Sequence, residues 1–261
     1  MKKDIKYFIR KYIENRPLFM ALIRPQEAML FYQNKKTIKQ PILDFGCGDG
    51  FFTETVFGKK SIDVGLDLIN SRAEEAEKKG IYKKVAFYDG KTIPYPDNYF
   101  KTVISNCVLE HISDLDVVLK EVYRVLKPNG IFMTTVMTTN WEKHLFGSKI
   151  LGKIYVNWLR KKQEHFSLLS EQKWNSKLGK CGFTIKKTEG YISPKNANYL
   201  DLFHYLSLPS LIIYKLFGKW SFNLFKPSKL IIDFVEKNTC LNYSNKKSSA
   251  LFIILTKKNE I

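Results

Sequence analysis

Between residues 41 and 137 the chain alternates short apolar runs with helix-like segments, and this alternation restricts the possible fold more than any other feature. The apolar runs cover residues 41–46, 61–68, 84–89, 101–108 and 130–137. Helices are predicted over 50–57, 70–80 and 113–130, the last with Ser113 as its expected N-cap. Strands joined in this way form a parallel sheet with right-handed crossovers. A ligand of such a sheet binds beyond the carboxyl ends of the strands.

The first apolar run ends in a glycine-rich turn, PILDFGCGDGFF, which places Gly46, Gly48 and Gly50 within five residues. Glycine costs backbone entropy in a regular element, so either the chain turns tightly here or a ligand approaches the backbone closely. The dinucleotide fingerprint has the spacing GxGxxG and an acidic residue about 20 positions later. This turn has GxGxG, followed by Asp67. Asp44 would suit a ligand with positive charge better than a pyrophosphate, and the turn itself contains no cationic residue.

The flanking segments follow other patterns. Residues 1–36 are expected to be helical, with interruptions at Pro17 and Pro25. Residues 138–168 are aromatic and basic without a strand signal, and a capped helix and a strand follow over 170–191. An irregular block over 192–247 precedes a last strand over 249–258.

Several stretches occur together in a specific order: ILDFGCGDG, VGLDL, Asp89-Gly90 followed by IPYPDNYFKTVISNCVLEHI, and EVYRVLKPNGIFMTTV. As a set they resemble the class I S-adenosylmethionine-dependent methyltransferases, most closely the ubiquinone/menaquinone-type and related small-molecule enzymes. The match covers residues 41–137, and 170–191 and 249–257 are similar to the family's sixth and seventh strands. The resemblance implies an α/β, Rossmann-like seven-stranded sheet, mostly parallel, with helices on both faces and an antiparallel last strand beside the fifth. It also implies an N-terminal helical lid over 1–36 and a methyltransferase domain over 37–261, in which 138–168 and a helical insertion over 192–247 cap the substrate.

The resemblance assigns the methionine end of S-adenosyl-L-methionine to the first strand and the turn. Asp44 and the backbone of Gly46, Cys47 and Gly48 would hold it, and the Asn106 carbonyl would face its amino group. Asp44 could instead only cap the turn, which is the alternative interpretation of a carboxylate at this position.

The adenosine end is assigned to the next two strands. Asp67 would accept hydrogen bonds from both ribose hydroxyls, and Leu68 would pack on the adenine face. Asp89 would accept from the adenine amino group while the Gly90 amide contacts the ring. Asp67 could instead be an ordinary strand-end carboxylate, and Asp89-Gly90 could be only a turn.

An oxygen acceptor must lose a proton during methyl transfer, and the candidate bases are His111 and His165. His111 follows the fourth predicted strand in LEHI, and His165 lies in the segment expected to fold over the substrate mouth. Each could instead be a structural histidine that bonds the backbone, and we favour that alternative for His111. The sequence shows no cluster with metal-ligand spacing, so no metal is expected.

The formal net charge of +18 favours an anionic partner such as nucleic acid, a membrane surface or a phosphorylated substrate. Most of the cations are lysines, which fits a compositional origin at least as well. The charged N-terminus lacks the apolar region of a signal peptide, and the scattered cysteines indicate neither disulfides nor zinc. We therefore expect a cytoplasmic protein, with peripheral contact at the inner membrane face left open.

The expected function is methyl transfer to a small-molecule or lipid-linked acceptor, with an oxygen of a sugar or glycolipid as the specific expectation. This follows from a weaker resemblance of the C-terminal third to methyltransferases of surface-polysaccharide and glycolipid biosynthesis. An RNA methyltransferase is the first alternative, although the sequence lacks an RNA-binding module and reads SNCV where base-directed enzymes have Asn-Pro-Pro-Tyr. A non-catalytic cofactor-binding scaffold is the second alternative.

Overall fold

The computed structural model describes residues 3–69, 71–218, 220 and 227–258. Within these residues the strands form one seven-stranded sheet in the order β3-β2-β1-β4-β5-β7-β6. The strands are β1 (Ile42–Phe45), β2 (Val64–Leu68), β3 (Lys84–Tyr88), β4 (Phe100–Asn106), β5 (Leu126–Met137), β6 (Phe183–Gly190) and β7 (Ala250–Lys257). The first five strands pair in parallel, and β7 is antiparallel to both β5 and β6. The predicted α/β sheet and its antiparallel last strand beside the fifth are confirmed.

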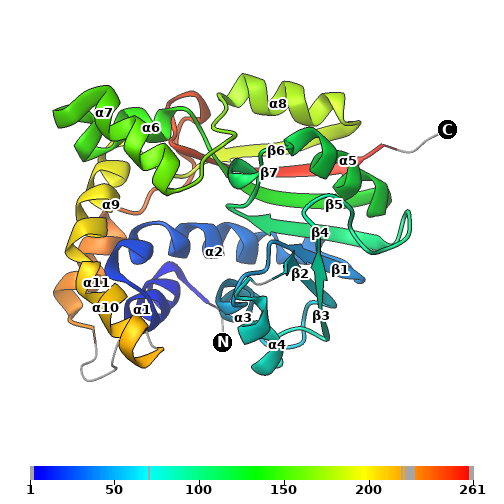
Figure 1. Cartoon of the computed structure of the whole chain (residues 1–261), viewed down its shortest axis with the longest axis horizontal. Coiled ribbons are helices and arrows are strands. Elements are labelled where there is room, and N and C mark those ends of the chain that lie inside the picture. The colour runs from blue at the N-terminus through cyan, green and yellow to red at the C-terminus, as the bar shows by residue number, and fades with distance from the viewer. Residues whose placement is uncertain (1–2, 70, 219, 221–226, 259–261) are drawn as a thin grey trace.

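Helices cover both faces of this sheet (Figure 1). The main helices are α1 (Ile5–Asn15), α2 (Arg24–Gln33), α3 (Phe51–Phe57), α4 (Ala73–Lys78), α5 (Leu115–Val125), α6 (Asn140–His144), α7 (Phe146–Lys162), α8 (Glu171–Lys180), α9 (Pro194–Leu206), α10 (Leu208–Phe217) and α11 (Lys229–Lys237). Short 3₁₀ helices include η1 (Leu18–Leu22), η2 (Lys35–Thr37), η3 (Leu109–His111) and η4 (Asn245–Lys247).

Alternate residues along the central strands belong to two separate hydrophobic cores. Ile104 and Met133 pack with the N-terminal helices, α3 and α4. Their neighbours Val103 and Phe132 pack with α5 and α8. Successive side chains of a strand point to opposite faces, so strands with apolar residues at every position must be covered on both sides.

The N-terminal segment has two roles in the fold. Phe31 of α2 stacks edge-on against Phe52 of α3 and Phe252 of β7, at centroid distances of 5.2 and 5.3 Å. The helix α2 therefore belongs to the layer that covers the sheet. The N-terminal segment also contacts the C-terminal insertion: α1 packs on α11, η1 packs on α9, and Gln26 of α2 accepts from the Cys240 amide at 2.6 Å.

Two local expectations are corrected. Helix α5 begins at Leu115, and its N-cap is Asp114 without a side-chain cap bond, so Ser113 is not the N-cap. The irregular pattern expected over 192–247 is wrong, whereas the helical insertion implied by the resemblance is confirmed, because the described part of this block contains α9, α10 and α11. Pro209 lies in the first turn of α10, where a missing amide proton costs nothing, so it starts a helix rather than breaking one.

Candidate active site

The glycine turn joins β1 to α3 and is tied to β2. Gly46, Gly48 and Gly50 have positive φ values of 76°, 50° and 73°. The amides of Gly46 and Cys47 both donate to the Leu66 carbonyl, at 2.8 and 3.1 Å. These two amide protons are already used within the fold, so they are not available to a ligand. What the turn provides for a ligand is a backbone surface that it can approach closely. The expected contact of this backbone with a cofactor stays a prediction.

Gly46 is required by its packing as well as by its backbone angle. A Cβ atom built at Gly46 would lie 2.4 Å from Cγ2 of Val108. We expect Gly46→Ala to destabilise the protein by about 2–4 kcal/mol, because left-handed backbone and overpacking each cost roughly 1–3 kcal/mol. Chemical denaturation measures the loss. Gly48→Ala is the matched control, since its Cβ would meet nothing within 4 Å. Equal stability of the two variants would contradict the packing argument.

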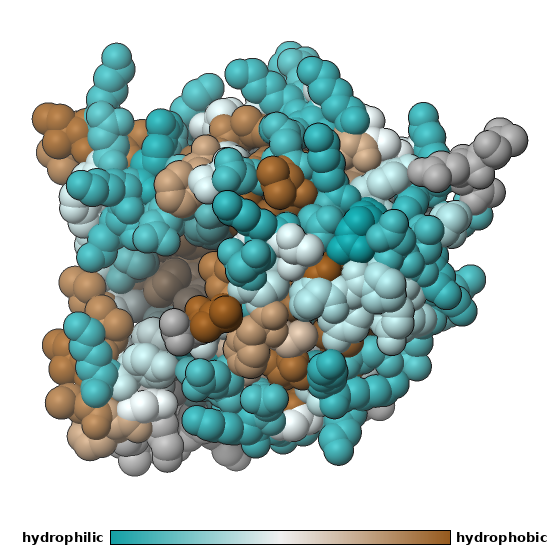
Figure 2. Space-filling view, turned by 45° about the vertical axis from the view of Figure 1, so that its right-hand side comes forward, coloured by the Kyte–Doolittle hydropathy of each residue, from teal (hydrophilic) through white to brown (hydrophobic). Residues whose placement is uncertain are grey.

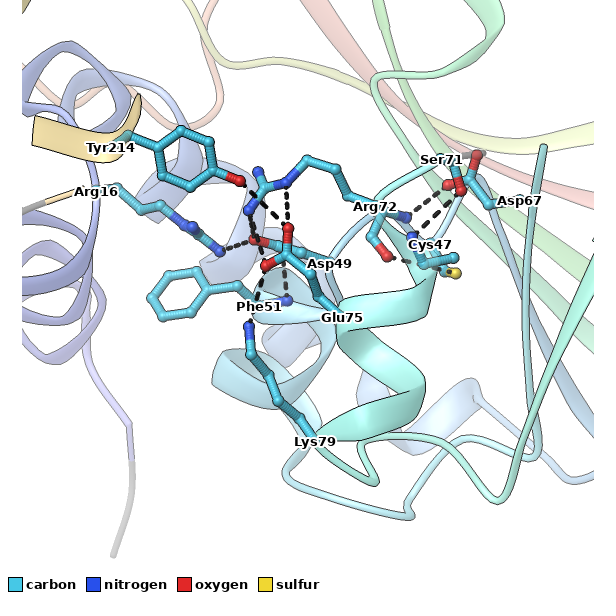
Figure 3. Close-up of polar contacts among 12 residues, drawn as sticks. Arg16, Cys47, Asp49, Phe51, Asp67, Ser71, Arg72, Glu75, Lys79 and Tyr214 are labelled. Atoms are coloured by element: carbon cyan, nitrogen blue, oxygen red, sulfur yellow. Dashed lines mark hydrogen bonds and ion pairs between the residues drawn. The ribbon is translucent and has the colours of Figure 1, made fainter. Parts of the chain in front are cut away.

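Asp67 lies at the end of β2 with its carboxylate held by the backbone. Its Oδ2 accepts from the Gly48 amide at 2.7 Å, and its Oδ1 accepts from the Leu68 amide at 2.8 Å. Figure 3 shows the carboxylate turned toward the glycine turn. A carboxylate has about four lone-pair positions, so each oxygen keeps capacity for another donor. This arrangement suits the predicted pair of ribose hydroxyls.

Asp44 is buried at the end of β1 and lines the same cavity as the turn. Its Oδ2 accepts from the Tyr82 hydroxyl at 2.5 Å and from the Thr53 hydroxyl. Burial raises the pKa of Asp44 to about 6. The two hydrogen bonds favour the ionised form and therefore lower the pKa, but burial has the larger effect. A nearby cation would favour the ionised form further. Both bonds come from side-chain hydroxyls rather than from the backbone of the turn, so they do not support the capping alternative, and contact with a positively charged ligand stays a prediction.

The residues predicted for adenine lie at the carboxyl ends of β2 and β3. Leu68 is 48% exposed, and a Cβ at Gly90 would come within 3.3 Å of its side chain. Oδ1 of Asp89 accepts from the amides of Lys91 and Thr92, both at 2.9 Å. These bonds show that Asp89 holds a turn. Its role as an acceptor for an adenine amino group is untested by this geometry.

The glycine turn opens into a cavity of about 180 Å³, which we call the turn cavity. Its described lining residues are Tyr12, Arg16, Met20, Arg24, Asp44, Gly46, Cys47, Gly48, Asp49, Phe51, Phe52, Arg72, Asn106 and Trp220. Five of the predicted cofactor residues therefore share one cavity: Asp44, Gly46, Cys47, Gly48 and Asn106. Tyr12 of α1 and Met20 of η1 contribute to its wall.

Arginines from distant segments reach the turn, although the turn itself has no cation. Arg16 and Arg72 both pair with Asp49, the latter at 2.8 Å, and Arg72 also pairs with Glu75 (Figure 3). Tyr214 of α10 donates to Glu75 at 3.3 Å. Burial opposes ionisation of Asp49, but the two arginine charges outweigh it and hold its pKa below the ordinary value. The network connects the end of α1, the turn, α4 and α10.

This network predicts that Arg16 fastens α1 over the turn cavity. Its side chain is 10% exposed and lies 4.1 Å from the centroid of Phe51. We expect Arg16→Ala to accelerate amide hydrogen exchange in α1 by about ten-fold or more, because a charged hydrogen bond contributes roughly 1.5–3 kcal/mol. Exchange in α5 should not change. Arg10→Ala, an exposed arginine of the same helix, is the control, and an equal effect of both variants would refute the assignment.

A buried carboxylate, Glu27 of α2, organises the wall behind the turn cavity. Its Oε2 accepts from Arg24 at 2.7 Å and from Asn106 Nδ2 at 2.9 Å. Its Oε1 accepts from the Tyr191 hydroxyl at 2.9 Å and from the Cys107 thiol at 3.1 Å. Cys107 has a positive φ of 52°, an uncommon backbone conformation for a residue with a side chain. The sequence did not reveal Glu27, since all of its partners except Arg24 lie far away along the chain.

A second cavity, of about 310 Å³, adjoins the first and contains both predicted histidines; we call it the histidine cavity. Its described lining residues are Phe19, Met20, Ile23, Arg24, Cys107, Glu110, His111, Met137, Trp141, Gln163, His165, Leu200, Asp201 and His204. Met20 and Arg24 line both cavities. The two cavities therefore meet near the carboxyl end of β4.

The rings of His111 and His165 lie 4.8 Å apart. Nδ1 of His111 is 3.0 Å from the Gln163 carbonyl. A carbonyl only accepts, so this nitrogen carries the proton and Nε2 of the neutral ring keeps a lone pair. Burial lowers the pKa of His165 to about 4, with smaller contributions from His111 and Arg160. The bond to Gln163 supports a structural part for His111, and neither histidine is tested as a base.

Glu110 is a candidate site residue that the sequence analysis did not predict. It is fully buried, lines the histidine cavity, and neither carboxyl oxygen has a hydrogen-bond partner among the described residues. Burial raises its pKa to about 7. A buried carboxyl without a partner needs an explanation, and a proton-transfer role in a cavity provides one. The signal was an acidic residue beside His111 in an otherwise apolar turn after β4.

Comparison with known proteins agrees with this geometry. Residues 43–134 match the family model described as a methyltransferase domain. The chain is 29% identical to the ubiquinone biosynthesis O-methyltransferase of Bradyrhizobium diazoefficiens over 55% of its length and 59% of that protein. It is 32% identical to the malonyl-[acyl-carrier protein] O-methyltransferase of Legionella pneumophila over 43% of its length and 42% of that protein. The matched region thus spans about half the length of these relatives.

Solved structures show the same fold. A methyltransferase from Thermotoga maritima, described as a possible histamine N-methyltransferase, superposes with a TM-score of 0.56 at 18% identity, covering 91% of this chain and 92% of that one. A protein from Galdieria sulphuraria, described as a putative sarcosine dimethylglycine methyltransferase, gives a TM-score of 0.57 at 18% identity, covering 90% of this chain and 84% of that one. At this identity the likeness establishes the fold alone.

Proposed function

Because the chain carries a class I S-adenosylmethionine-dependent methyltransferase domain, we propose that it transfers a methyl group to a small molecule bound in the histidine cavity. The observation that supports this proposal most directly is the junction of two cavities. The turn cavity contains most of the predicted cofactor residues, and the histidine cavity contains the candidate bases. A group-transfer enzyme must hold its two reactants in contact and correctly oriented, because this positioning can lower the activation barrier by about 7–11 kcal/mol.

S-adenosyl-L-methionine is the cofactor of this domain, and the residues present fit it. Gly48 has open space where a side chain would stand, and Asp67 keeps acceptor capacity beside it. We assign the ribose hydroxyls to Asp67, the adenine to Leu68, Asp89 and Gly90, and the methionine end to Asp44, Gly46, Cys47, Gly48 and Asn106. When bound, the cofactor supplies a methyl group on a sulfonium that is already activated for displacement.

This chain's own residues then position the acceptor and move its proton. We assign Glu110 as the base, because this residue lines the cavity and neither oxygen of its buried carboxyl group has a hydrogen-bond partner among the described residues. A general base is most effective when its pKa lies near the working pH, because the group is then often ionised and still accepts a proton readily. The lone pair on Nε2 of His111 makes that residue the second candidate. His165 is the third, and its low pKa makes it the weakest base of the three.

The lining of the histidine cavity suggests a hydroxylated acceptor. Glu110 and Asp201 bring carboxyl groups to this lining, and Trp141, Phe19 and Leu200 offer apolar contact. Asp201 already accepts from the Gly147 amide at 2.8 Å and from the Tyr155 hydroxyl. Alternating acceptors and apolar surface suit a ring that carries several hydroxyls. The specific proposal is therefore an oxygen of a sugar or glycolipid, with a lipid-linked acceptor working at a membrane surface.

The cavity geometry does not favour the RNA alternative. A polynucleotide site requires a basic track and stacking surfaces that are open to solvent. Arg24 is the one lysine or arginine among the described residues that line the histidine cavity, and it is paired with Glu27. The other acidic or basic side chains of this lining, apart from its histidines, are the carboxyl groups of Glu110 and Asp201, which offer phosphates no attraction.

The test is a calorimetric titration with S-adenosylmethionine, S-adenosylhomocysteine and NAD. Micromolar binding of the first two without NAD binding is the expected result, and binding of NAD alone would overturn the proposal. Methyl transfer to a panel of sugars, glycolipids and RNA oligonucleotides then identifies the acceptor class. Cofactor binding without transfer to any of them would favour the scaffold alternative.

A further inference from the structure

Helix α10 lies on the surface although its sequence, LPSLIIYKLF, is almost entirely apolar. None of its residues is buried, and Leu216 is 70% exposed. Leu208, Leu211 and Ile212 are also exposed and lie on the same side of the helix as Leu216. A helix that is apolar on nearly all sides is normally buried, so this one is expected to have a partner.

A second apolar ridge lies on α7. Ile154 is 79% exposed, and Ile150, Leu151 and Trp158 are exposed with it. Helix α9 contacts both α7 and α10 and exposes Leu206 between them. In Figure 1 these three helices form the left side of the molecule, and Figure 2 shows apolar surface at the upper and lower parts of that side. We call this surface, formed by the exposed apolar residues of α7, α9 and α10, the apolar face.

The charges carried by α7 and α10 themselves are all positive, although Glu142 of α6 pairs with Arg160 and Glu164 is exposed just after α7. The segments 146–162 and 202–218 contain no aspartate or glutamate. The exposed cations of these segments are Lys149, Lys153, Arg160, Lys161, Lys162 and Lys215. Apolar side chains bordered by lysine, with tryptophan and tyrosine among them, are typical of a surface that enters the headgroup region of an anionic bilayer.

The helices of this face are suited to lying on a bilayer. None of the helices in the described residues is long and apolar enough to cross a membrane. The ten residues of α10 would span about 15 Å, roughly half of the hydrocarbon core. A short apolar helix beside lysines is therefore expected to rest at the interface.

The apolar face also lies directly above the histidine cavity. On α9, Leu200, Asp201 and His204 line the cavity, whereas Leu202 and Leu206 are exposed on the other side of the helix. We propose that the apolar face docks this protein on the surface of an anionic phospholipid bilayer, with the histidine cavity beneath the docked helices. This docking is independent of whether the proposed methyl transfer is correct.

The experiment is flotation of the full chain with vesicles of phosphatidylcholine alone and of phosphatidylcholine with phosphatidylglycerol, without cofactor or acceptor. We expect binding to the anionic vesicles that weakens with salt. The double variant Ile154→Glu/Leu216→Glu should bind about ten-fold or more weakly, because charged groups resist entry into the apolar boundary. The control Ser113→Glu/Val117→Glu adds the same charge at exposed positions beside and on α5 and should bind normally.

Circular dichroism and binding of S-adenosylhomocysteine check that both double variants are folded. Three outcomes would overturn the proposal. The first is no binding of the unmodified chain to anionic vesicles. The second is equal binding of both double variants, which would indicate only nonspecific attraction by lysines. The third is that the unmodified chain forms a dimer in analytical ultracentrifugation, that this dimer does not bind vesicles, and that Ile154→Glu/Leu216→Glu dissociates it. A second copy of the chain, rather than a bilayer, would then cover the apolar face.

Discussion

A Glu110→Gln variant is expected to bind S-adenosylmethionine normally and to transfer methyl groups about 10²–10⁴-fold more slowly, the range that a general base typically contributes. Glutamine keeps the size of the side chain and removes only its ability to accept a proton. The rate of the unmodified enzyme should rise with pH and level off above about 7, where Glu110 becomes ionised. This pH dependence should be absent from the residual rate of the variant. Single-turnover rates across pH measure both effects.

The same substitution should have a separate signature in stability. The pKa of Glu110 is raised from 4.5 to about 7 in the folded protein. Between these values the unfolded chain has lost a proton that the folded protein keeps, so rising pH favours unfolding. Above pH 7 this effect lowers the free energy of unfolding of the unmodified protein by on the order of 3 kcal/mol, relative to its value at low pH. Glu110→Gln should therefore gain stability relative to the unmodified protein as the pH rises through this window.

Activity and stability thus change in opposite directions for Glu110, which a purely structural residue would not show. His111→Asn and His165→Asn are the comparison variants. If Glu110→Gln kept full activity while either histidine variant lost it, the base would be that histidine and the assignment of Glu110 would be wrong. Denaturation at about pH 5 and pH 8 gives the stability comparison independently of any acceptor.

Asp67→Ala is expected to weaken binding of S-adenosylmethionine by about 100-fold or more. Two hydrogen bonds to a charged acceptor contribute roughly 1.5–3 kcal/mol each, which corresponds to at least two powers of ten in Kd. The variant also releases the Gly48 amide, which Asp67 now holds at 2.7 Å. Calorimetry with S-adenosylhomocysteine measures the loss without turnover.

The control for Asp67 is Asp116→Ala, which removes a carboxylate whose side chain is 67% exposed and paired with Lys177 on the far face of the sheet. It should bind the cofactor normally. Equal binding by Asp67→Ala and the unmodified protein would show that Asp67 is only a strand-end carboxylate. If Asp67→Ala lost both cofactor binding and its folded circular dichroism spectrum, Asp67→Asn would replace it as the test variant. Asparagine keeps one acceptor oxygen, so Asp67→Asn should bind the cofactor with intermediate affinity.

Much of the fold could be predicted because its signals are local. The apolar runs gave the strands, since a strand covered on both faces needs apolar residues at consecutive positions. The glycine spacing located the turn at the end of β1, and Ser170 correctly marked the start of α8, where its hydroxyl accepts from Lys173. The antiparallel position of β7 came from the resemblance, because strand order in a sheet has no local signature.

The site was predicted unevenly for the same reason. The predicted cofactor residues follow strand ends that neighbouring parallel strands bring to one edge, so their proximity was a consequence of the pattern. Glu110 was missed because its significance depends on burial without a partner, and no window of sequence contains that information. The pattern over 192–247 was interpreted as irregular, although Pro209 in this block begins α10 rather than breaking a helix.

The sequence by itself determined the parallel sheet, the glycine turn and the set of strand-end carboxylates, because periodicity and spacing act between residues close in the chain. Only the tertiary structure decided what surrounds them. It placed Arg16 and Arg72 on Asp49, brought Glu27 beneath Asn106, 79 residues away, and left α10 exposed. Pairing, burial and exposure depend on which distant segments meet, and these contacts form only when the whole chain is packed.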